Sequence, residues 1–171
     1  MPPWSEQDIH HRTSPNLQSL KADYVDSLEP IADFKSITRL SLKFQRDLDY
    51  SPLNDCKSLT ELHLKVYKSD ADAFAEKLVF SGIKKLVIDG DFRVDTTVFP
   101  VMDKLESLQL YEVGEMDGLL RQPKLRELLL CNCGQEKLKQ LPKLLEIPTF
   151  EVVRSKWTSD IHLQRPEESE D

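Results

Sequence analysis

The chain has 171 residues, 39% hydrophobic and 31% charged, and is therefore long enough for one domain with its own core. Its formal net charge of −7 argues against a nucleic-acid binder, because such proteins carry clustered positive surface. No apolar run reaches the roughly 18 residues of a membrane span. Three cysteines and a start without a secretory signal favour a cytoplasmic or nuclear protein.

Residues 1–13 are predicted to be either a short helical cap or a frayed terminus. Ser5 is a suitable N-cap with Asp8 three residues later, and Trp4 and Ile9 have the spacing of a hydrophobic staple. A helix here would cover the first unit of the fold, whereas the alternative is an unstructured end. Both interpretations are compatible with the sequence.

One apolar pattern recurs seven times along the chain. Its clearest copy is KLRELLLCNC, in which Leu125, Leu128 and Leu130 have the spacing L-x-x-L-x-L. The first apolar residues of the copies lie 20 to 24 positions apart: Leu17, Ile37, Leu59, Ile83, Leu105, Leu125 and Ile147. Further apolar residues lie three and six positions before most copies. Because no copy can bury both stripes alone, the pattern predicts stacked units with one continuous core over residues 14–157.

The segments between the copies are predicted to form short helices and loops. Ser69–Gly82 is expected to be an α-helix with Phe74 and Leu78 on its apolar face, and its closing glycine suits the C′ position. Leu48–Asp55 is too short for more than a turn or a 3₁₀ segment. Residues 158–171 lose the period and end in RPEESED, which predicts an acidic, disordered tail.

At these residues the chain resembles the leucine-rich repeat superfamily. SLEPIADFKSITRLSL and LDYSPLNDCKSLTELHL are similar to the 22-residue class of internalins and of the regulatory subunit of protein phosphatase 1. KLRELLLCNC, with Cys133, is more similar to the cysteine-containing class of F-box proteins. The resemblance implies an α/β solenoid with about seven parallel strands on its concave face and short helices and loops on its convex face. Because the family's usual Asn ladder is absent, we expect an irregular solenoid.

The residues between the repeat leucines are expected to lie on the exposed concave face, since strand side chains alternate. One row on this face is Ser19, Arg39, Glu61, Lys85, Ser107 and Glu127. The next row is Lys21, Ser41, His63, Val87, Gln109, Leu129 and Glu151. The third is Asp23, Lys43, Lys65, Asp89, Tyr111, Cys131 and Val153. Opposite charges are neighbours in these rows, which is typical of a solvated surface.

An apolar cluster on the C-terminal strands of this face is the predicted partner-binding site. Tyr111 is its anchor, because tyrosine is enriched among interface hot spots. The remaining members, including two charged residues of its rim, are Val87, Leu129, Cys131, Val153, Lys85 and Arg126. In the alternative interpretation, the C-terminal residues Trp157, Ile161 and Leu163 fold back over this cluster as a cap.

The sequence thus predicts a monomeric, non-catalytic protein-interaction module that binds neither nucleic acid nor membrane and needs no cofactor. One alternative is the substrate-recognition part of a ubiquitin-ligase adaptor, which the repeat with Cys133 suggests. Another class is a hydrolase using Ser41, His63 and Asp89, but an open sheet provides no oxyanion hole. A metal site at Cys131 and Cys133 is not expected, since Cys131 is expected to face outward and Cys133 the core, so that one ion cannot easily bind both.

A row of larger side chains follows the first three strands. Tyr24, Phe44 and Val66 have the parity of the core if each strand continues to that point. We therefore expect them to be buried, and the alternative is an exposed binding row.

Overall fold

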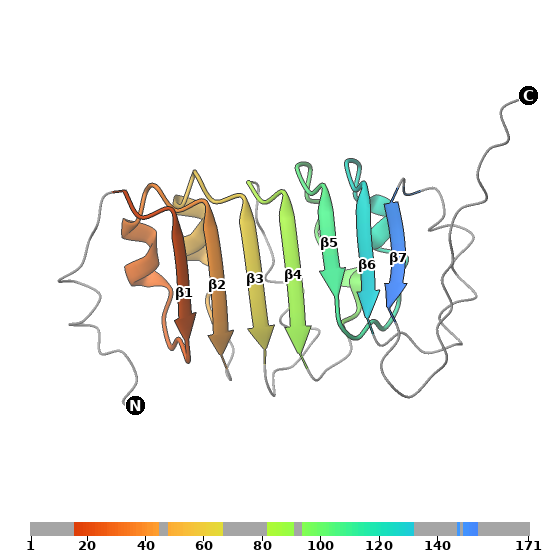
Figure 1. Cartoon of the computed structure of the whole chain (residues 1–171), viewed down its shortest axis with the longest axis horizontal. Coiled ribbons are helices and arrows are strands. Elements are labelled where there is room, and N and C mark those ends of the chain that lie inside the picture. Colours follow the sequence, from red (N-terminus) through yellow and green to blue (C-terminus); the bar gives the residue numbers. More distant parts are fainter. Residues whose placement is uncertain are drawn as a thin grey trace, which may run out of the picture.

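The computed structural model describes residues 16–44, 48–66, 82–90, 94–131, 147 and 149–153. These residues form one open sheet of seven parallel strands, arranged in chain order and pointing in the same direction (Figure 1). The strands are β1 (Ser19–Asp23), β2 (Arg39–Phe44), β3 (Glu61–Val66), β4 (Lys85–Gly90), β5 (Ser107–Leu110), β6 (Glu127–Cys131) and β7 (Thr149–Val153). The seven strands expected from the repeated pattern are confirmed.

Short 3₁₀ helices lie in the segments that return from one strand to the next. They are η1 (Glu29–Asp33), η2 (Ser51–Asp55), η3 (Thr96–Val98) and η4 (Leu119–Arg121). Proline occupies the first turn of η1 and η2, where its missing N–H costs no hydrogen bond. The prediction of a turn or 3₁₀ segment within Leu48–Asp55 is confirmed.

The repeat leucines fill the core behind the sheet. Leu40, Leu62, Leu86, Leu108 and Leu128 are successive partners across five strands, and none is more than 2% exposed. The apolar residues expected from the return segments are buried against them, including Ile31, Phe34, Leu53, Cys56, Phe99 and Met102. Stacking therefore closes one continuous apolar core across the described units.

The starts of β2 to β6 repeat one backbone arrangement. The carbonyl oxygen of Thr38 accepts hydrogen bonds from the N–H groups of Thr60 at 2.9 Å and of Glu61 at 3.0 Å. The carbonyls of Gln18, Thr60, Lys84 and Glu106 each accept the same pair of bonds from the following strand. Successive units therefore share their backbone geometry as well as their apolar pattern.

A buried glutamine joins two neighbouring return segments. Gln122 is only 5% exposed and occupies the position that Phe34, Cys56 and Met102 fill in other units. Its Oε1 accepts a hydrogen bond from the backbone N–H of Met102 at 2.9 Å. Its Nε2 donates to the carbonyls of Pro100 at 3.1 Å and Gly118 at 3.2 Å. The side chain thus satisfies backbone groups where other units place an apolar residue.

Two expectations about the strand ends differ in outcome. Val66 is fully buried, as expected, whereas Tyr24 is 52% exposed, so its predicted burial is wrong. Tyr24 has φ 57°, which turns the chain out of the sheet and breaks the alternation on which the prediction depended. Its ring lies 4.9 Å from the Nζ of Lys43, a cation–π distance. The side chain of Phe44 is not described.

Several predictions fall on residues that the structure does not describe. They concern residues 1–13, residues 158–171 and, apart from Gly82, the helix over residues 69–82. Gly82 lacks the positive φ of a C′ glycine, so that role is wrong. A Cβ at Gly82 would lie 3.1 Å from the carbonyl oxygen of Leu59, which explains a glycine there by close packing.

Among the described residues, no helix is both long enough and apolar enough to span a membrane.

Candidate functional site

The sheet has an open face, formed by the outward side chains that alternate with the core leucines. The first two rows predicted for this face are continuous in the register of β1 to β6, and the third is continuous in the register of β1 to β4. The side chains of its middle row are Lys21, Ser41, His63, Val87, Gln109 and Leu129. Lys21 is exposed and the other five are half-buried, whereas the repeat leucines on the opposite side are buried. The open face is therefore the accessible side of the sheet.

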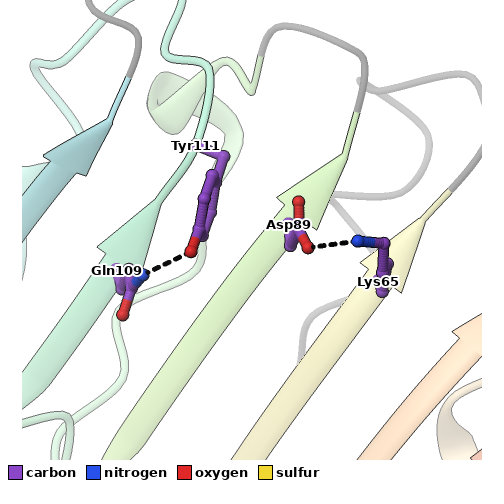
Figure 2. A network of polar contacts seen from close by, with 4 residues as sticks. All are labelled: Lys65, Asp89, Gln109 and Tyr111. Carbon is purple, nitrogen blue, oxygen red and sulfur yellow. Dashed lines mark hydrogen bonds and ion pairs between the residues drawn. The ribbon is translucent and has the colours of Figure 1, made fainter. Parts of the chain in front are cut away.

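Tyr111 lies directly after β5, where its backbone N–H donates to the carbonyl of Ile88 at 3.2 Å. Its ring is half-buried, and its hydroxyl oxygen accepts a hydrogen bond from the Nε2 of Gln109 at 3.0 Å (Figure 2). In Figure 2 the ring lies between Gln109 on β5 and Asp89 on β4. The bond holds the ring against the face and leaves the hydroxyl proton available for a further acceptor.

The predicted apolar cluster is interrupted by a polar residue. Val87 and Leu129 belong to β4 and β6, and Gln109 lies between them in register. The two apolar side chains are thus two strand steps apart, about 10 Å at the usual spacing. The alternation of strand side chains predicted the face of both residues correctly but gave no role to Gln109. The i, i+2 relation of Gln109 and Tyr111 on one strand face was the signal for their contact.

The other predicted members lie around this centre. Cys131 is half-buried at the end of β6, and Lys85 is exposed at the start of β4. Val153 belongs to β7, but its side chain is not described. Arg126 is exposed and precedes β6, where it belongs with Lys84 and Glu106 to the edge at which the strands begin. Its role in the rim of a binding site stays a prediction.

A salt bridge crosses the open face beside Tyr111. The Nζ of Lys65 on β3 and the Oδ2 of Asp89 on β4 are 2.8 Å apart, and both side chains are partly exposed (Figure 2). The pairing confirms the opposite-charge neighbours expected at this point of the third row. An exposed pair of this kind stabilises the fold by at most about 1 kcal/mol, so it matters more for the local charge than for stability.

His63 occupies the middle of the face, between Ser41 and Val87. Burial lowers the pKa of its imidazole; Asp89 opposes this effect, and Lys65 and Lys21 add to it. Its Nε2 is buried and has no hydrogen-bond partner among the described residues. A neutral ring is therefore the favoured form at pH 7.

The three residues of the hydrolase alternative lie on neighbouring strands but do not form a relay in this arrangement. Ser41 and His63 are partners in register, while Asp89 lies two residues beyond the partner of His63 on β4. The carboxylate of Asp89 contacts Lys65, and the Nε2 of His63 has no hydrogen-bond partner in the part of the chain that the structure describes. Nucleophilic catalysis needs a base that contacts both the nucleophile and an orienting acid.

The two described cysteines differ in environment. Cys56 is buried, and its Sγ donates to the carbonyl of Ile31 at 3.6 Å. Burial raises the pKa of this thiol, with Lys35 opposing and Asp55 adding to the effect, so the unreactive thiol form is favoured. Cys133, on which the F-box-type resemblance depended, lies outside the described residues. Within the described ranges, no group of three or more His, Cys, Asp or Glu side chains is placed to hold a metal ion.

Comparison with protein-family models and with curated proteins gives no match to this chain.

Proposed function

We propose that the chain is a leucine-rich repeat solenoid of the cytoplasm or nucleus that binds a protein partner on its open face. The observation that carries the proposal is the contrast between the two sides of the sheet. One side packs into a continuous core, whereas the other presents half-buried side chains to solvent. The second side is not needed to close the core, and this supports its use for recognition.

The chemistry of the C-terminal half of the face suits a protein partner. Val87 and Leu129 offer apolar area, and Tyr111 adds an aromatic ring already held by Gln109. A side chain fixed before binding loses less conformational entropy in the complex. Tyrosine also combines apolar area with a polar tip, which is the usual character of an interface anchor.

A matched pair of substitutions tests this proposal. Leu129→Arg places a long cation in the middle of the open face, while Leu120→Arg makes the same change in η4, at a leucine that is 41% exposed. Each variant is immobilised and used to capture proteins from a cell extract, which are quantified by mass spectrometry. We expect wild type and Leu120→Arg to retain the same proteins and Leu129→Arg to lose them.

For a purified captured partner, Tyr111→Ala should weaken binding by about 2 kcal/mol, roughly thirtyfold in Kd. Thermal unfolding of each variant shows that it remains folded. A folded Leu129→Arg variant that captures the same proteins as wild type would refute binding on the open face. If Tyr111→Ala lowers stability rather than affinity, the ring is internal packing and the anchor is misassigned.

A further inference from the structure

The open face is positively charged at its N-terminal end although the chain as a whole carries −7. Over β1 to β3 its outward charged residues are the cations Lys21, Arg39, Lys43 and Lys65 and the anions Asp23 and Glu61. Four cations against two anions give this area a net charge of +2, which falls to +1 when Asp89 on β4, the salt-bridge partner of Lys65, is included. The corresponding residues of β5 and β6 include a single charge, that of Glu127. Charge on this face is therefore segregated along the row of strands.

The centre of the positive area is a small polar residue. Ser41 is half-buried on β2, with Lys21 beside it on β1 and His63 beside it on β3. Its short side chain lets an approaching group come close to the surrounding cations. Burial lowers the pKa of the neighbouring His63 ring; Asp89 opposes this effect, and Lys65 and Lys21 add to it.

The positive area and the apolar residues are separated by a fixed distance. Ser41 on β2 and Leu129 on β6 belong to the same row and are four strand steps apart. At about 4.8 Å per step this is roughly 19 Å, which an extended segment crosses in about six residues. An α-helix would need about 13 residues for the same distance.

We propose that the partner contributes an extended segment that crosses the strands, with acidic side chains over β1–β3 and apolar side chains over β4–β6, about six residues apart. This inference rests on the proposed function and adds the chemistry of the partner. Complementary charge at one end fixes the direction of the segment, and the apolar residues at the other end supply the buried contact area. A nucleic acid fits less well, because Asp23 and Glu61 lie among the cations and would repel phosphates.

The probe is a library of random twelve-residue peptides displayed on phage and selected against the wild-type chain. We expect the enriched peptides to carry an acidic cluster about six residues from an apolar cluster. One enriched peptide is then synthesised, and its Kd is measured with a charge-reversed variant, Lys21→Glu/Arg39→Glu. The matched control is Lys104→Glu/Lys124→Glu, which makes the same change at exposed lysines in the turns before β5 and β6.

We expect the Lys21→Glu/Arg39→Glu variant to weaken binding at least about tenfold and the control to stay within about twofold of wild type. Enriched peptides without acidic residues, or an affinity that charge reversal leaves unchanged, would overturn the inference. If peptides without acidic residues still fail to bind the Leu129→Arg variant, this inference fails but the proposed function survives. A library that yields no binder, or binders insensitive to every change on the face, would contradict both this inference and the proposed function. A single-stranded DNA oligonucleotide that binds through Lys21 and Arg39 would overturn the assignment to a protein segment.

Discussion

Replacing Gln122 by methionine should lower the free energy of unfolding far more than the same substitution at a half-buried glutamine. Methionine keeps nearly the same length and volume, so the substitution removes hydrogen bonds without opening a large cavity. Three bonds are lost, from the N–H of Met102 and to the carbonyls of Pro100 and Gly118. At about 1 kcal/mol for each neutral bond, the expected loss of unfolding free energy is about 3 kcal/mol.

Gln109→Met is the matched control, because Gln109 is half-buried and its hydrogen bond to the hydroxyl of Tyr111 is only partly buried. Its expected loss is below about 1 kcal/mol. Urea unfolding of both variants measures the difference directly. For a chain of this size, 3 kcal/mol corresponds to a fall of roughly 6–12 °C in Tm. A Gln122→Met loss no larger than that of Gln109→Met would show that water or a rearranged loop satisfies the same backbone groups.

Three further predictions concern the core, one return segment and the open face. Leu108→Ala should cost about 2–5 kcal/mol in urea unfolding, since the side chain is buried in a central unit, and a loss under about 0.5 kcal/mol would contradict the register. Gly118→Ala should lower the free energy of unfolding by about 1–3 kcal/mol, because the added Cβ would overlap the carbonyl of Thr96. Gly114→Ala should lower it less, because a Cβ there makes only ordinary van der Waals contacts, and equal losses for the two variants would refute this explanation. Because the pKa of His63 is lowered in the fold, the free energy of unfolding should decline as pH falls below 6.5. His63→Gln should reduce that decline, and a variant whose stability depends on pH as the wild type's does would exclude His63 as its source.

The sequence was sufficient for the parts of the fold that follow a fixed period. Leu62 and Leu108 could be assigned to the core because the two-residue alternation of strands gives the same inward positions in copies that recur every 20 to 24 residues. Tyr24 could not be assigned in this way, since a single residue with positive φ ends the alternation and no neighbouring glycine signals the turn. Gln122 was missed for a related reason. Its burial depends on backbone groups of the adjacent unit, which the apolar pattern does not record.

The candidate site was predictable in its rows but not in its contacts. Alternation placed Val87, Leu129 and Tyr111 on the same face, which the register of the strands supports for the two strand residues. The bond between Gln109 and Tyr111 depends on how the ring is turned, and no spacing rule determines that rotation. Opposite charges within the rows were read as mutually neutral, and this interpretation concealed the excess of cations over β1–β3.

That excess is informative because stability does not require it. Lys21 and Arg39 are exposed, and surface charges of this kind contribute about 1 kcal/mol or less to folding. The inward positions of the same strands are fixed by core packing, whereas the outward positions could carry other polar residues without altering the register. In a chain of net charge −7, the excess of the four cations Lys21, Arg39, Lys43 and Lys65 over the anions around them is therefore not explained by folding or by overall composition. Recognition of a negatively charged segment explains both their sign and their position on the open face.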